Sequence, residues 1–170
     1  MFVLGIDPGL TRCGYAVIEP GRRGGGRAIS LGVITTDRDL TTPLRLAELR
    51  REFALLFEEF RPGVLAVERL FFQNNLHSAV GVAQAAGLAM SEGAIRGVPV
   101  VEYSPNQIKA AVTGDGRADK AMVATMVKTL LGLPAAPQPA DAADAAALAL
   151  CHLAHDPTGL HPLNERRATT

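Results

Sequence analysis

The sequence predicts an α/β fold in which a five-stranded mixed sheet is flanked by helices on both faces. Two observations lead to this prediction. Three consecutive strand-like segments open the chain, and after them apolar segments with helical and with strand periodicity alternate. The predicted order is βββαβαβααα, which is typical of a sheet that combines antiparallel and parallel pairs. The 170 residues, of which 48% are hydrophobic, suffice for one buried core.

The opening strands are predicted at residues 1–6, 12–19 and about 28–36. The turn-forming run DPG at 7–9 separates the first two strands, and a segment rich in Gly and Arg separates the second from the third. Strands joined by such short connections pair antiparallel. We therefore expect this part of the sheet to be a meander.

The later elements are predicted from their apolar periodicity and their end signals. Leucine and phenylalanine recur at helical spacing after Pro43, and Pro62 with Gly63 ends that helix. Small residues line one face of the following helix, so we expect a partner helix to pack closely there. The predicted elements are a helix to residue 60, a strand at 64–67, a helix at roughly 78–96, a strand at 98–102, helices at 105–113 and about 119–131, and a last helix after the Pro-rich link 134–140.

One domain is predicted over residues 1–155, followed by a flexible tail at 156–170 that is polar and has no periodicity. The first residues lack the features of a signal peptide, and no apolar stretch approaches the roughly 20 residues of a membrane span. We therefore expect a cytoplasmic protein without a membrane partner. Cys13 and Cys151 lie in apolar segments without metal-ligand spacing, so we expect reduced core thiols.

Four carboxylates stand where this fold would bring them together. Asp7 and Glu68 each follow a short apolar strand, and Asp141 and Asp144 lie three residues apart at the start of an Ala- and Leu-rich helix. Carboxylate oxygens without His or Cys suit Mg²⁺ or Mn²⁺, and two such ions are the usual apparatus for in-line displacement at phosphorus. The pattern therefore predicts a divalent-metal site.

Each of these residues also has a purely structural interpretation. Asp7 begins a good turn sequence, and Glu68 stands at a strand end where glutamate is common. Asp141 with an acid three residues later resembles a capping box, which predicts Asp141 as the N-cap of the last helix. Capping requires only one of the two aspartates, so the structural and the metal-binding roles can coexist.

Four blocks of this sequence resemble the RuvC-type Holliday junction resolvases, whose fold is ribonuclease H-like. The blocks are GIDPGLTRCGYAVIE, AVERLFFQNN, VVEYSPNQIKAAVTGDGRADK and DAADAAALA, and they occur in the family's order over residues 1 to about 155. The resemblance implies an endodeoxyribonuclease that acts as a homodimer and resolves four-way DNA junctions by paired symmetric nicks with 5′-phosphate and 3′-hydroxyl ends. It further implies that Asp7 bridges two Mg²⁺ ions, that Glu68, Asp141 and Asp144 complete their shells, and that Mn²⁺ substitutes.

The resemblance also implies which residues contact DNA. Phe71 matches an aromatic residue that wedges into the opened junction, with Phe72 as the alternative, and stacking on a base contributes about 1–3 kcal/mol. Lys109 and Lys120 match basic positions near the DNA backbone, and Arg69 is added as a DNA-binding candidate. The branch-migration helicase complex is a further partner that the resemblance suggests.

The charge balance is unusual for a DNA-binding protein, because 17 basic and 17 acidic residues give a net charge of zero. Two divalent ions would add four positive charges, and all three lysines fall between residues 109 and 128. One alternative is an ATP-binding protein of the actin-like sugar-kinase superfamily, which would need a second phosphate loop that we do not find. Another is a catalytically inactive nucleic-acid-binding module, which the absence of one carboxylate would favour, but all four are present.

Overall fold

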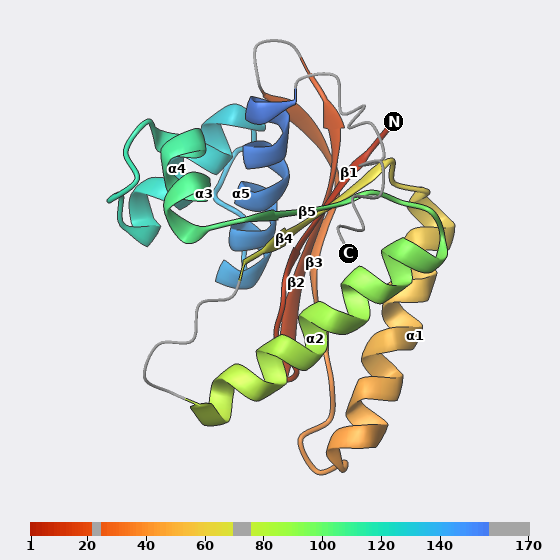
Figure 1. Ribbon diagram of the computed structural model, residues 1–170. Helices are drawn as coiled ribbons and strands as arrows, with labels where there is room; N and C mark the ends of the chain where they lie inside the picture. The colour runs from red at the N-terminus through yellow and green to blue at the C-terminus, as the bar shows by residue number, and fades with distance from the viewer. Residues whose placement is uncertain (22–24, 70–75, 157–170) are drawn as a thin grey trace, which may run out of the picture.

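The computed structural model describes residues 1–21, 25–69 and 76–156. These residues contain a five-stranded sheet with the strand order β3-β2-β1-β4-β5 (Figure 1). The strands are β1 (Val3–Asp7), β2 (Arg12–Pro20), β3 (Gly26–Thr35), β4 (Val64–Glu68) and β5 (Val100–Tyr103). The pairs β1–β2 and β2–β3 are antiparallel, whereas β1–β4 and β4–β5 are parallel. The predicted meander and mixed sheet are confirmed.

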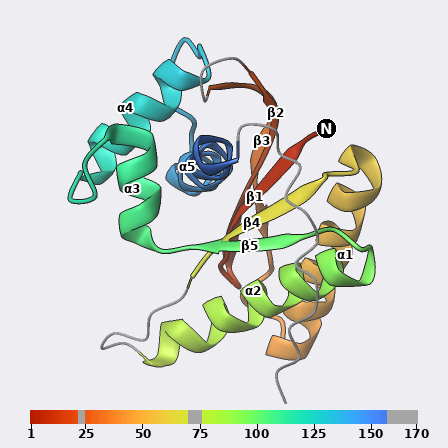
Figure 2. The same ribbon diagram turned by 45° about the horizontal axis from the view of Figure 1, so that its top comes forward.

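Five helices cover the two faces of this sheet in the described residues. They are α1 (Thr42–Phe60), α2 (Leu76–Ile95), α3 (Pro105–Thr113), α4 (Lys120–Leu130) and α5 (Ala140–His155). Figure 2 shows α3, α4 and α5 on one face and α1 and α2 on the other. Each face has its own apolar core, and Cys13 and Cys151 are buried in one core each, as expected. None of the described helices is both long and apolar enough to cross a membrane.

Helix α5 packs unusually close to the sheet, because its partners on the strands are glycines. A methyl group at Gly5 of β1 would collide with the carbonyl oxygen of Ala145, and one at Gly14 of β2 would collide with that of Asp141. Alanine fills most of the buried face of α5, so there are few long side chains to hold the helix away. This close approach fixes the first turn of α5 directly over β2.

One prediction about the helices needs correction, and another is confirmed. Asp141 is not the N-cap of α5: the N-cap is Pro139, no side chain caps the helix, and Asp141 lies in the first turn. An aspartate is favoured both at the N-cap and within the first turn, so the sequence could not distinguish these positions. The partner helix predicted for the small-residue face of α2 is α1, and a Cβ added at Gly93 would contact Phe57 of α1, whereas one added at Gly87 would meet no atom within 4 Å. At the start of α5, where no side chain caps the helix, neither Asp141 nor Asp144 has a capping role.

Candidate active site

Two carboxylates come from neighbouring strand ends. Strands β1 and β4 are parallel, and their register pairs Ile6 with Val67. The next residues, Asp7 and Glu68, are the last of each strand and so lie at the same edge of the sheet. Both are half-buried. Because both strands are buried, the backbone positions of Asp7 and Glu68 are fixed relative to each other.

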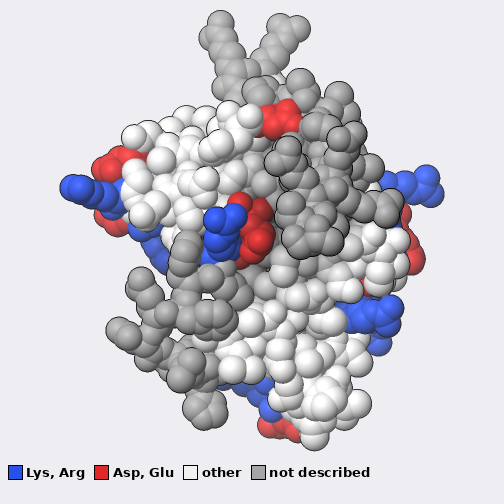
Figure 3. Space-filling view, viewed as in Figure 1, with Lys and Arg blue, Asp and Glu red and all other residues white. Residues whose placement is uncertain are grey.

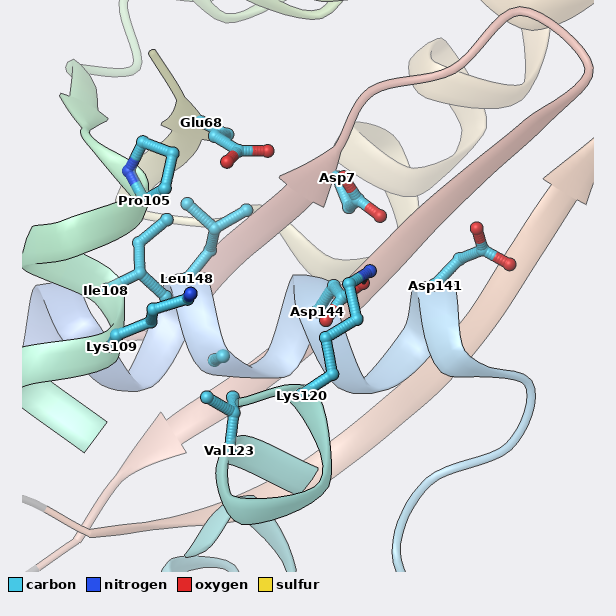
Figure 4. Close-up of a pocket in the computed structure, with 11 residues that line it drawn as sticks. Asp7, Glu68, Pro105, Ile108, Lys109, Lys120, Val123, Asp141, Asp144 and Leu148 are labelled. Atoms are coloured by element: carbon cyan, nitrogen blue, oxygen red, sulfur yellow. Dashed lines mark hydrogen bonds and ion pairs between the residues drawn. The ribbon is translucent and has the colours of Figure 1, made fainter. Parts of the chain in front are cut away.

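The other two carboxylates come from one side of α5. Asp141 and Asp144 are three residues apart, a spacing that places them on the same side of a helix. Their side chains retain 31% exposure each, because they project from the buried helix toward the sheet edge. In Figure 4, Asp7 lies between Glu68 and the two aspartates of α5. All four carboxylates line a single cavity of about 360 Å³.

Helices α3 and α4 contribute two lysines to the same cavity. Ser104 and Gln107 form a capping box that starts α3, and this helix carries Lys109. The Asp119 side chain accepts a hydrogen bond from the Met122 backbone N–H and starts α4, so Lys120 is the first residue of that helix. Figure 3 shows acidic and basic side chains side by side near the middle of this face of the molecule.

The strand-end carboxylates are electrostatically strained. Burial, reinforced by the charges of Asp144, Glu68 and Asp141, raises the pKa of Asp7 to about 7. Burial and the charge of Asp144 also raise the pKa of Glu68. Within the described residues, neither Asp7 nor Glu68 forms an ion pair or accepts a side-chain hydrogen bond. A cation that entered here would relieve the repulsion directly.

The carboxylates of α5, by contrast, each hold a basic side chain. Arg12, the first residue of β2, donates hydrogen bonds from Nε and Nη2 to Oδ2 of Asp141 at 2.9 and 2.7 Å. The Lys120 ammonium donates to Oδ2 of Asp144 at 2.9 Å, and this hydrogen bond is the main reason that the pKa of Lys120 is raised. The negative charge of each helix carboxylate is thus already partly balanced, by Lys120 of the cavity lining for Asp144 and by Arg12 for Asp141.

The donor chemistry of the cavity fits hard divalent cations, because it offers carboxylate oxygens without sulfur or imidazole. The geometry is less complete. Among the described residues, no three His, Cys, Asp or Glu side chains are arranged to hold one metal ion. The strand-end pair and the helix pair line one cavity, but their side chains are not arranged around a single metal position. The raised pKa values of Asp7 and Glu68 mean that their ionised forms are unfavourable and that a nearby positive charge would stabilise them.

The remaining predicted residues have different outcomes. Arg69 is exposed, and its backbone N–H donates to the carbonyl oxygen of Tyr103, but its side chain does not line the cavity. Phe71 and Phe72 lie outside the described residues. His152, expected at the surface or in packing, is buried with Nδ1 2.9 Å from the Tyr103 hydroxyl oxygen.

Arg12 is a residue that the sequence did not single out. Its position directly after the turn that begins at Asp7 was visible in the sequence. Its partner Asp141, however, is 129 positions away. Only the packing of α5 onto β2 brings the two together.

Comparisons with known proteins agree with this architecture. The family model described as "Crossover junction endodeoxyribonuclease RuvC" matches residues 3–152. A protein of that name from Salinispora arenicola is 53% identical over 155 residues, which cover 90% of this chain and 87% of the relative. Its counterpart from Streptomyces avermitilis is 49% identical over 156 residues, with the same coverage of 90% and 87%.

Solved structures give the same result. The structure of Thermus thermophilus RuvC "in complex with Holliday junction substrate" matches with a TM-score of 0.88 and 36% identity, covering 94% of this chain and 97% of that one. The yeast mitochondrial Holliday junction resolvase Ydc2 matches with a TM-score of 0.64 at 19% identity, which supports the fold alone. The expected fold class is confirmed.

Proposed function

The chain belongs to the RuvC family of crossover junction endodeoxyribonucleases, and on this premise we propose that it resolves Holliday junctions with Asp7, Glu68, Asp141 and Asp144 as its catalytic, metal-binding set. The observation that carries the residue assignment is their convergence on one cavity from three distant parts of the sequence. The family consists of metal-dependent nucleases. Two Mg²⁺ ions, with Mn²⁺ as a substitute, are the complement that this proposal assigns to each subunit.

Asp7 has a different position in the cavity from the other three carboxylates. Asp7 stands between the other strand-end carboxylate and the helix pair, so it is the residue best placed to be shared between two ions. Ions bound there would activate a water and stabilise the leaving 3′ oxygen, as two-ion sites do in phosphodiester hydrolysis. The proposed products have 5′-phosphate and 3′-hydroxyl ends.

The lysines of the cavity are proposed to hold the DNA backbone. Lys109 has no carboxylate within ion-pair distance in the part of the chain that the structure describes, so its charge is available for a phosphate. Lys120 is held by Asp144, and a second anion on the same ammonium would be a phosphate oxygen of the cut strand. Arg69 and Phe71 remain further DNA-binding candidates.

The proposed unit is a homodimer. A four-way junction resolved by symmetric cuts needs two active sites related by a twofold axis, and a C₂ dimer supplies them at a fixed separation. We further propose a cytoplasmic location and contact with a branch-migration helicase complex. The sugar-kinase and inactive-module alternatives have no support from the relatives described above.

The proposal is tested with synthetic four-way junctions and plain duplexes of equal length, each strand labelled in turn. With Mg²⁺ we expect paired nicks at symmetric positions in the junction only, and ligase should seal the products. Ca²⁺ should support junction binding without cleavage, since it occupies oxygen sites but is a poor catalyst of this chemistry. Cleavage of neither substrate, or of both equally, would overturn the assignment.

A further inference from the structure

A second cavity lies on the other side of the turn that follows Asp7. It has a volume of about 380 Å³, and residues of the β1–β2 turn, the first part of α1 and the first half of α2 line it. The lining includes Thr11, Arg12, Arg45, Gly81 and Val82. Figure 1 shows the starts of β2 and α1 at the same end of the molecule. The cavity is therefore formed by both the sheet edge and the α1/α2 layer.

Arg45 is held rigidly in this second cavity. Its Nε donates to the hydroxyl oxygen of Thr36 at 2.9 Å, and its Nη2 donates to that of Thr11 at 2.6 Å. The Thr36 hydroxyl in turn donates to the Leu10 carbonyl oxygen at 2.6 Å, and Thr36 is only 6% exposed. The guanidinium is thus fixed against the turn by neutral partners.

The charge of Arg45 is not compensated. The half-buried arginine has no carboxylate within 4.0 Å in the described parts of the chain. The other described arginines that lack one are all exposed, namely Arg38, Arg61, Arg69 and Arg117. A guanidinium with its donors on two hydroxyls still has N–H groups free for an anion. A fixed, unneutralised guanidinium at the wall of a cavity is a preformed contact for phosphate.

Arg12 connects this second cavity to the carboxylate cavity. It lines the second cavity and donates to Asp141, which lines the first, so one ion pair links the two cavities. A DNA strand that passes the carboxylates and crosses the β1–β2 turn would next meet Arg45. We propose that Arg45, with Arg12, binds a backbone phosphate of the cut strand beside the scissile one. This inference rests on the function proposed above and adds a contact on the opposite side of the turn.

Val82 allows a test that leaves the hydrogen bonds of Arg45 intact. Val82→Glu places a carboxylate in the second cavity, and Val82→Gln places a neutral side chain of the same shape there. With Ca²⁺ present, Val82→Glu should weaken junction binding several-fold more than Val82→Gln. It should also make the dependence of log affinity on log salt shallower by about 0.9 for each lost phosphate contact. Equal binding by the two variants would overturn the inference.

Arg45 itself gives the second arm of the test. Arg45→Gln should make the salt dependence shallower by about 0.9, while Arg45→Lys should retain it, because the slope counts charge rather than shape. Arg51→Gln is the matched control, since it removes one charge from the same helix, where Arg51 pairs with Glu52. If Arg45→Lys loses as much slope as Arg45→Gln, or if Arg45→Gln behaves as Arg51→Gln, Arg45 is only structural.

Thermal unfolding of each variant separates folding from binding, and the Val82 pair decides the question if Arg45→Gln does not fold. The two proposals also fail separately. A wild-type protein that cuts junctions selectively while both arms show no charge effect contradicts the phosphate site alone. A wild-type protein that does not distinguish junction from duplex contradicts the proposed function itself.

Discussion

The two carboxylate pairs of the cavity differ in how their charge is balanced. Asp7 and Glu68, at the ends of strands, have raised pKa values and no basic side chain within ion-pair distance among the described residues. Asp141 and Asp144, on α5, each hold a basic side chain at hydrogen-bond distance. The negative charge of the strand pair is therefore not balanced by an ion pair, while the negative charge of the helix pair is already partly balanced.

This difference indicates a division of tasks within one site. Charges that repel each other in a half-buried place cost folding free energy until a cation arrives, so the strand pair should dominate metal affinity. Partly exposed ion pairs contribute little to stability, so the helix pair is free to exchange Arg12 and Lys120 for other partners. Mutations at the two pairs should consequently have different signatures.

The largest expected effect is on catalysis at the strand pair. Asp7→Asn should lower junction cleavage by about 10³-fold or more, because metal-ion catalysis contributes several kcal/mol and each 1.36 kcal/mol is tenfold in rate. Junction binding should stay intact or become tighter, since one negative charge is lost. Single-turnover cleavage and binding in Ca²⁺ measure the two effects. A variant that no longer folds would instead indicate that Asp7 serves the turn.

Removing Lys120 should have the next largest effect. Lys120→Gln should slow cleavage by about 10- to 100-fold, because a hydrogen bond to a charged group is worth about 1.5–3 kcal/mol. If Lys120 mainly balances Asp144 before metal binds, the variant should also reach half-maximal rate at a lower Mg²⁺ concentration. The Mg²⁺ dependence of single-turnover rates measures both. Lys128→Gln is the control, since Lys128 lies in the last turn of α4 and does not line the cavity.

Stability without metal provides a third comparison. Burial raises the folded pKa of Asp7 to about 7, above the ordinary value of 3.8, so folding is penalised when Asp7 is ionised. The penalty is absent below about pH 4, grows as the pH rises, and is complete above about pH 7. Asp7→Asn should therefore raise the free energy of unfolding in EDTA at pH 8 by up to about 4 kcal/mol, but not at pH 4. Urea denaturation at both pH values measures this difference, and an equal gain at both would contradict it.

The smallest effect is expected at the helix pair. Arg12→Gln should change the free energy of unfolding by less than about 1 kcal/mol, because the Arg12–Asp141 ion pair is partly exposed and screened by salt. A destabilisation of several kcal/mol, measured by urea denaturation in EDTA, would mean that the pair holds α5 on the sheet. In that case the contrast between the two carboxylate pairs would be much weaker.

The sequence predicted the parts of this site that depend on local patterns. Asp7 and Glu68 follow apolar strands, and neighbouring parallel strands bring their ends to one edge, so their meeting was predictable. The N-cap of α5 was predicted at the wrong residue, because aspartate is favourable at the N-cap and at several first-turn positions. Arg12 and Arg45 were missed because their roles arise from contacts between distant segments, such as the approach of α5 to Gly14 of β2. No periodicity encodes such contacts.

We infer that a divalent ion supplies the positive charge that Asp7 and Glu68 lack within ion-pair distance among the described residues. This inference is tested most directly by thermal unfolding of the wild type and Asp7→Asn at pH 8, each in EDTA and in saturating Mg²⁺. Binding to the folded state alone stabilises by about 2.7 kcal/mol at a concentration one hundred times Kd. We expect a clear rise in Tm with Mg²⁺ for the wild type and little or none for Asp7→Asn. An equal rise in both, or none in the wild type, would contradict it.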